Sequence, residues 1–322
     1  MVDLFTPLKI RDIEIRNRIV LPPMATEKST KDGHTTEALY RHYEELATGP
    51  GMIIVEHSYV DPRGKLSPNQ LGIYDDTHTD GLRELAERIS SGGAVPVIQI
   101  SHGGGKCSPD VTGKRAEAPS NVYFTDAQVI SETRKKELKD AFVKAAERAM
   151  KAGFQGVEVH GAHGFLLGQF LSPVTNRGEE RYGLEERMGF PLEVVEGVKK
   201  VLKDRLLLYR LGASDMMEGG LTTEESGRFA SELEKRGVDI LDVSGNLCGS
   251  RPDTHEQGYF IPLAEEMKGY VKVPVIGVGG IKEPIFADSV VREGRIDLVA
   301  VGREQWGNPK WAVNAKDILK KE

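Results

Sequence analysis

Residues 156–183 read GVEVHGAHGFLLGQFLSPVTNRGEERYG, and the rest of the chain is organised around this stretch. Its first five residues alternate small or apolar residues with polar ones, as a short buried strand does. His163 follows three residues after His160, and in a chain that begins to turn into a helix this spacing places both imidazoles on one side. Two neutral imidazoles can donate two N–H bonds to one small acceptor. The stretch therefore predicts a strand that ends in a histidine pair.

Length and composition indicate the class of protein. The chain has 322 residues, of which 39% are hydrophobic and 29% are charged, an ordinary soluble composition. The net charge of −6 argues against nucleic acid as the main partner. Cys107 and Cys248 are far apart and lack metal-binding spacing, so we expect a reducing cytoplasm and no disulfide framework. No run has the length of a signal peptide or a membrane span, so we expect no membrane partner.

Apolar strands alternate with amphipathic helices along the chain. Phe5–Ile15 contains two alternating runs around a polar pair, which predicts an N-terminal β-hairpin. Eight apolar runs follow, at residues 18–22, 51–56, 95–100, 156–160, 206–211, 238–243, 274–278 and 297–301. Between them, apolar stripes such as those in 36–48 and 138–150 predict helices. Because eight units favour a closed barrel and no linker is visible, we predict an α/β fold, a (β/α)8 TIM barrel forming one domain over residues 1–322.

Polar residues gather where the predicted strands end, which is where the active site of such a barrel lies. Gly279-Gly280 and Gly302-Arg303 follow the last two strands and offer unobstructed N–H groups and one cation, as a phosphate site requires. The residues alone leave alternatives open. Arg210 could snorkel to the surface. His160 and His163 could be a structural pair, or two metal ligands joined by a third from His102, His57 or Glu56.

The central stretch resembles the Old Yellow Enzyme family of FMN-dependent ene-reductases, whose pattern is roughly H-x-x-[HN]-G-Y-L-x-x-Q-F-L-S-P-x-x-N. The matching residues are His160, His163, Gly164, Leu166, Gln169, Phe170, Leu171, Ser172, Pro173 and Asn176. The resemblance extends from Leu4 to about Trp311. The chain departs from the pattern at Phe165, where the family has Tyr. It departs again after Tyr182-Gly183, where a Gly and a Ser are missing, so we expect a reshaped loop on the substrate side.

The resemblance implies FMN as the cofactor. The residues that match the family's cofactor contacts are Pro23, Met24, Ala25, Thr26, Gln99, Arg210, Gly279, Gly280, Gly302 and Arg303. Arg210 would face N1 and O2 of the flavin, and Gln99 would bond its pyrimidine edge. Thr26 would lie near the C4 carbonyl, where it can act in catalysis by tuning the redox potential.

The resemblance also implies the reaction. NADH or NADPH would pass hydride to the flavin, and an activated alkene such as an enone would take hydride at its β-carbon and a proton at its α-carbon. His160 and His163 would bind the substrate carbonyl oxygen, where enolate charge develops. Phe165 would contact the substrate. His57 stands where the family tends to have a small residue beside the flavin, so we count it among the substrate-binding residues while its role stays open between a second acid, a packing residue and a substrate selector. The family's Tyr donates the proton, which a phenyl ring cannot do, so we consider water and three other donors: His57, His255 and Tyr182.

Other functions stay open on the same barrel. One is an FMN-dependent amine dehydrogenase or demethylase. Another is a phosphate- or metal-dependent aldolase or isomerase without flavin, and a third is a flavin-binding sensor without turnover. Under the ene-reductase interpretation, we expect a small activated alkene as the partner and no metal site. A homo-oligomer is also compatible with this interpretation.

Overall fold

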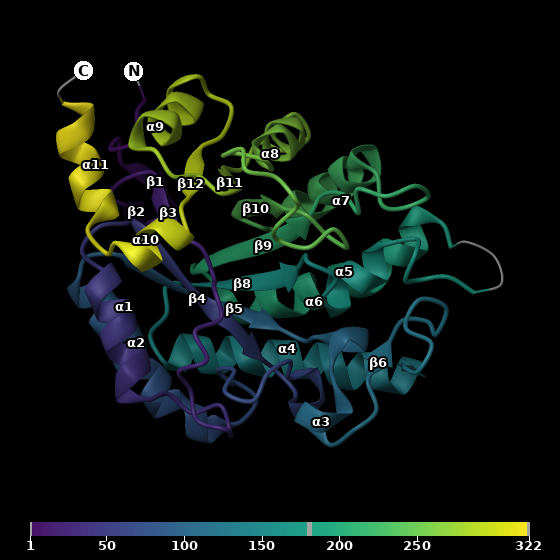
Figure 1. The fold of residues 1–322 in the computed structure, drawn as a ribbon. Coiled ribbons are helices and arrows are strands. Elements are labelled where there is room, and N and C mark those ends of the chain that lie inside the picture. The colour runs from purple at the N-terminus through teal and green to yellow at the C-terminus, as the bar shows by residue number, and fades with distance from the viewer. Residues whose placement is uncertain (1, 179–181, 321–322) are drawn as a thin grey trace.

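The computed structural model describes residues 2–178 and 182–320, and it confirms the predicted barrel and hairpin (Figure 1). Eight parallel strands close into a barrel in the order β10-β11-β12-β3-β4-β5-β8-β9. Each coincides with one predicted apolar run. Their bounds are β3 Ile19–Leu21, β4 Met52–Tyr59, β5 Val95–Ser101, β8 Gly156–Gly161, β9 Leu206–Gly212, β10 Ile240–Ser244, β11 Val275–Gly277 and β12 Leu298–Ala300.

Helices surround the barrel (Figure 1). The longer ones are α1 Glu37–Leu46, α2 Thr79–Ser91, α4 Glu132–Lys151, α6 Leu184–Leu202, α7 Thr223–Lys235, α8 Ile261–Lys268, α9 Pro284–Arg292 and α11 Trp311–Leu319. The capping box expected at Thr222 is present, since its side chain accepts from the Glu225 N–H and that glutamate bonds back. Neither α8 nor α11 was predicted from the sequence pattern. Within the described ranges, no helix is long and apolar enough to cross a bilayer.

The N-terminal hairpin closes one end of the barrel. It consists of β1 Leu8–Ile10 and β2 Ile13–Ile15, with Leu8 opposite Ile15. Ile15 is fully buried against the aliphatic residues of the barrel interior. The amino-terminal end of the barrel is therefore a hydrophobic plug, and the opposite end is left for a site.

Inside the barrel, the side chains change character along each strand. On β9, Leu206 and Leu208 belong to the aliphatic interior, and Arg210 follows two residues later on the same face. The same change occurs on β4, β5 and β10, which reach Glu56, Gln99 and Asp242 by the same two-residue step from aliphatic residues. The strands thus carry buried polar groups toward their carboxyl ends.

Candidate active site

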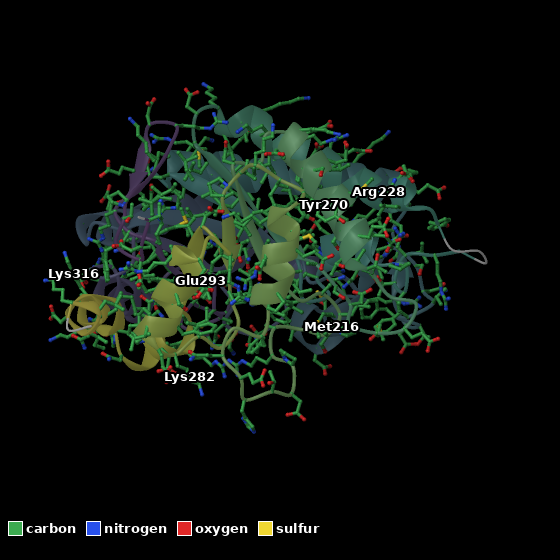
Figure 2. The ribbon with its side chains drawn as sticks, turned by 90° about the horizontal axis from the view of Figure 1, so that it is seen from above. Met216, Arg228, Tyr270, Lys282, Glu293 and Lys316 are labelled. Atoms are coloured by element: carbon green, nitrogen blue, oxygen red, sulfur yellow. The ribbon has the colours of Figure 1, made fainter. Side chains whose placement is uncertain are left out.

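A cavity of ≈ 520 Å³ opens at the carboxyl ends of the strands. Its wall contains these predicted residues: Pro23, Met24, Ala25, His57, Gln99, His160, His163, Phe165, Arg210, Gly280, Gly302 and Arg303. It also contains residues that the sequence analysis missed, among them Lys106, Arg251, Tyr259 and Lys282, the last of which Figure 2 labels. The barrel thus brings together residues that are almost 300 positions apart, as the fold predicts.

Two predicted cofactor residues lie outside this wall. Thr26 is held by Glu56, because its hydroxyl donates to Oε1 at 2.6 Å and its backbone N–H donates to Oε2 at 3.0 Å. Gly279 has a φ of +139°, and its carbonyl accepts from the Gly258 N–H at 2.5 Å. A Cβ there would lie 2.7 Å from the backbone nitrogen of Phe260. Gly279 therefore shapes the turn that brings Gly280 to the cavity. The loop expected to be reshaped includes residues 179–181, which lie outside the described part.

The histidine pair forms one side of the cavity. The ring centroids of His160 and His163 are 5.2 Å apart. His163 has a left-handed φ of +55°, and its Nε2 lies 2.8 Å from Ser244 Oγ. Burial lowers the pKa of both imidazoles well below the ordinary range, and the nearby Arg210 cation lowers it further. Both rings are therefore neutral at pH 7 and carry one N–H each. The N–H of His163 is available to an oxygen ligand when Ser244 donates its hydroxyl proton to Nε2, which places the ring proton on Nδ1.

Phe165 connects the histidine pair to His57. Its ring centroid lies 4.2 Å from that of His160 and 5.2 Å from that of His57. Gln70 donates its amide nitrogen to Nδ1 of His57 at 2.7 Å, and the same amide accepts from the Leu66 N–H at 2.7 Å. This arrangement makes Nδ1 of His57 an acceptor and leaves the proton on Nε2. Burial lowers the pKa of His57 to about 4, so this ring is also neutral at pH 7.

A buried charge cluster lies below the cavity. Arg210 pairs with Asp242 at 3.2 Å, and Gln99 donates to Glu158 at 2.7 Å. Both carboxyl groups are fully buried, and desolvation raises the pKa of each. The pKa of Glu158 lies well above its ordinary range, because Asp242 adds repulsion to the desolvation. We therefore assign the proton to Glu158 and the negative charge to Asp242, which leaves the cluster neutral with Arg210.

The cavity fits a flat heterocycle with an anionic tail. Arg210 is buried, and within the described chain its Nε has no hydrogen-bond acceptor while its Nη1 faces Asp242, so the Nε side of the guanidinium can serve a bound group. At the other end, a Cβ on Gly280 would meet Tyr259 at 2.8 Å, and one on Gly302 would meet Met24 Sδ at 2.8 Å. Arg303 supplies a cation beside these two glycines. The residues therefore match a flavin, with its ring at Arg210 and an anionic group at the two glycines.

A metal at the histidine pair would need further ligands. Among residues 2–178 and 182–320, no group of three or more His, Cys, Asp or Glu side chains is arranged to hold a metal ion. His102, a possible third ligand from the sequence, is not on the wall that contains the histidine pair. Its Nδ1 accepts from the Gly104 N–H at 3.0 Å.

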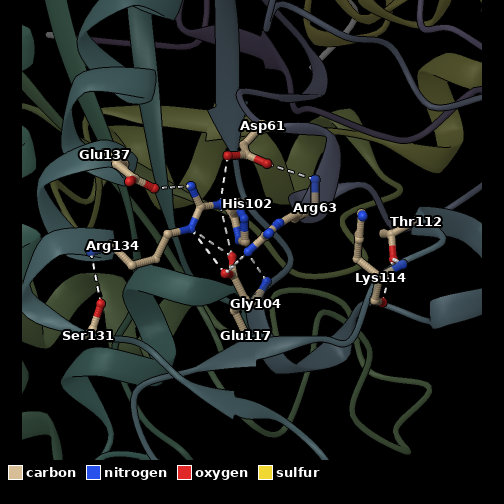
Figure 3. A network of polar contacts seen from close by, with 10 residues as sticks. All are labelled: Asp61, Arg63, His102, Gly104, Thr112, Lys114, Glu117, Ser131, Arg134 and Glu137. Atoms are coloured by element: carbon tan, nitrogen blue, oxygen red, sulfur yellow. Dashed lines mark hydrogen bonds and ion pairs between the residues drawn. The ribbon is translucent and has the colours of Figure 1, made fainter.

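An ionic network fixes the loop that follows β5 (Figure 3). Arg134 of α4 bonds to Asp61 at 2.7 Å and to Glu117 at 2.9 Å, and Arg63 bonds to Glu117 at 2.6 Å. Figure 3 shows His102 beside these groups. Glu117 is buried, and several charges share the site, so the network is stronger than an isolated surface pair. It joins α4 to the segments on either side of β5. Gly64, next to Arg63, accepts at its carbonyl from the Gly103 N–H at 2.9 Å, which links the loop after β5 to the network.

The chain resembles proteins of known activity along nearly its whole length. The model of the NADH:flavin oxidoreductase / NADH oxidase family matches residues 3–322. An NADPH dehydrogenase from Geobacillus sp. (strain WCH70) is 37% identical over 98% of this chain and 94% of its own. An NADH oxidase from Thermoanaerobacter brockii is 42% identical, and the chain spans 51% of that protein. An Old Yellow Enzyme from Pichia sp. AKU4542 superposes with a TM-score of 0.84 at 25% identity, over 98% of this chain and 87% of the other. The chain therefore belongs to the NADH:flavin oxidoreductase / NADH oxidase family, which includes the Old Yellow Enzymes, and is an NAD(P)H-dependent flavin oxidoreductase.

Proposed function

We propose that this protein is an FMN-dependent ene-reductase that uses NADH or NADPH to reduce the C=C bond of α,β-unsaturated carbonyl compounds. The observation that carries the proposal is the pair of neutral imidazoles, His160 and His163, on the wall that also contains Arg210. Neutral N–H donors suit an oxygen that becomes an enolate, because they strengthen their bonds as negative charge develops.

Each end of the cavity has its own task in this function. The phosphate of FMN would be held by Gly280, Gly302 and Arg303, and the ring by Gln99 and Arg210. When bound, the flavin supplies hydride transfer. Arg210 offers a fixed positive charge, and Asp242 holds that charge in place below the cavity.

The substrate is held by the remaining wall. His160 and His163 would donate to the carbonyl oxygen, while Phe165 and His57 would contact the carbon skeleton. Ser244, which also lies on the cavity wall, bonds to the ring of His163 and fixes its orientation. Because the imidazoles stay neutral, they bind the oxygen without giving up a proton.

Amine oxidation is the second candidate, and Phe165 is the observation that favours it. An amine dehydrogenase protonates no carbon and therefore needs no acid at this position. Assays with tertiary amines and an artificial electron acceptor would separate it from alkene reduction.

The ene-reductase proposal is tested by a phenol, whose phenolate resembles the enolate oxygen. We expect a phenol to bind over the flavin and to produce a long-wavelength charge-transfer band. In His160→Ala/His163→Ala the band should disappear while flavin content stays unchanged, and enone turnover should fall, since one well-aimed donor contributes roughly 3 kcal/mol to the transition state. Near wild-type enone turnover in this double variant would overturn the oxyanion role.

A further inference from the structure

The proposed reaction needs a proton at the α-carbon, and Phe165 cannot supply it. Of the three side chains considered from the sequence, only His57 lies on the cavity wall among the described residues. His255 and Tyr182 are exposed elsewhere. A side-chain donor on this wall must therefore be His57 or a residue that the sequence did not reveal, and water is the alternative that the test below has to separate from it.

His57 is poorly suited to this role. Its Nδ1 accepts from Gln70 and its proton is on Nε2, as described above. Burial holds the pKa of the ring at about 4, so it is neutral at neutral pH. The N–H of a neutral imidazole is a hydrogen-bond donor and a very weak acid. His57 can thus orient a substrate, but it has no acidic proton to give.

Lys106 lies on the same wall, next to the ring that replaces the family's Tyr. It ends the short 3₁₀ turn Gly104–Lys106, which belongs to the loop after β5 that the network of Figure 3 holds through Gly64 and Gly103. Its Nζ lies 5.5 Å from the centroid of Phe165 and donates to the His163 carbonyl at 3.0 Å. An ammonium has three N–H groups, so two remain for a substrate.

The turn that carries Lys106 is fixed from below. The Gly105 N–H donates to Oε1 of Gln169 at 3.0 Å, and the same side chain donates to the carbonyl of Gly103 at 3.0 Å. Gln169 is fully buried on α5 (Leu166–Leu171), the helix that begins next to Phe165. The lysine and the phenyl ring are therefore held in one rigid unit.

We propose that Lys106 is the general acid that protonates the α-carbon, in place of the missing tyrosine; this inference rests on the ene-reductase function. After hydride reaches the β-carbon, the alkene electrons move to the carbonyl oxygen as an enolate. An N–H of the Lys106 ammonium then gives its proton to the α-carbon. The enolate electrons form the new C–H bond, the carbonyl re-forms, and the neutral amine takes a proton from water.

The surroundings of Lys106 support both halves of this cycle. Desolvation lowers the pKa of its ammonium below the ordinary value, which makes it a stronger acid than a lysine in water. The side chain is nevertheless exposed through the cavity mouth, so water can restore the proton. A cation at this place also attracts the enolate that it protonates.

The test uses the flavin-loaded protein, reduced with NADPH and mixed in a stopped-flow instrument with 2-cyclohexenone or with ferricyanide. Ferricyanide takes electrons without protonating a carbon. We expect Lys106→Met to slow flavin reoxidation by the enone about 10²–10⁴-fold, and to leave flavin content and reoxidation by ferricyanide unchanged. Lys106→Arg keeps the charge but cannot release a proton near neutral pH, so it should be as slow as Lys106→Met.

Two further measurements separate proton donation from a structural role. In the wild type the enone rate should fall at alkaline pH as Lys106 loses its proton, and Lys106→Met should lack this limb. Adding Phe165→Tyr to Lys106→Met should restore most of the rate, because it supplies an acid at the family's position. A wild-type rate in Lys106→Met, or in Lys106→Arg, would overturn the proposal. If the wild type itself reacts with ferricyanide but not with the enone, the ene-reductase function fails first and the proposal falls with it.

Discussion

The two ends of the barrel are built from the same strands and differ in chemistry. On β9, Leu206 and Leu208 form part of an aliphatic floor that the N-terminal hairpin covers. Two residues further along the same face, Arg210 belongs to a rim with Asp242 and Glu158. The floor gains stability from removing apolar area from water, whereas the rim buries charges at a cost in free energy. Because neighbouring strands all carry the free-energy cost of burying a charged or polar group at this level, we infer that these groups serve the function of the rim.

The largest expected effect concerns the balance of charge in the rim. Asp242→Asn would leave the buried Arg210 without its counter-ion, which destabilises proteins by about 3–5 kcal/mol. Glu158→Gln on β8 is the matched control. It should change the unfolding free energy little, because an amide resembles the protonated acid that we assign there. Urea unfolding and flavin content measure both variants. If Glu158→Gln is the more damaging of the two, the proton sits on Asp242 instead.

The sequence revealed the strands of this rim better than their partners. LLLYR reads as a buried strand, and the resemblance to a known family then identified Arg210. Glu158 was read only as a polar position in the central strand, and Asp242 was not singled out, because their pairing depends on which strands become neighbours. Lys106 was missed for another reason. It follows GGG in an aperiodic loop, and only the tertiary contacts to His163 and Phe165 bring it to the cavity.

The second prediction tests whether the floor is independent of the chemistry above it. Leu208→Ala removes a fully buried side chain from the aliphatic interior and should cost about 3 kcal/mol of unfolding free energy. Turnover per folded, flavin-loaded molecule should stay within about twofold of the wild type. The side chain of Leu208 is not among the residues of the cavity wall, and it can make no hydrogen bond to the polar groups there. A tenfold loss of turnover or of flavin affinity would show that packing in the floor also sets the geometry of Arg210.

The smallest effect concerns Glu56, which reaches the rim on β4 and holds Thr26. Burial raises its pKa from 4.5 to about 7 in the folded protein. Because the folded state then binds the proton more tightly than the unfolded state, this group's contribution to stability is complete below pH 4.5. It is lost as the pH rises through 7.

From pH 5 to pH 8 the loss due to Glu56 should be roughly 2–3 kcal/mol, and Glu56→Gln should remove it, so that the variant's unfolding free energy changes less with pH than that of the wild type. Glu45→Gln, on the exposed face of α1, controls for the loss of one carboxylate. Urea unfolding at both pH values measures the difference. The rim would thus contribute a pH-dependent loss of unfolding free energy. The floor consists of aliphatic side chains, which do not titrate, and contributes no such loss. Equal pH slopes for the wild type and Glu56→Gln would mean that Glu56 is already ionised when folded, with the two Thr26 bonds compensating for its burial.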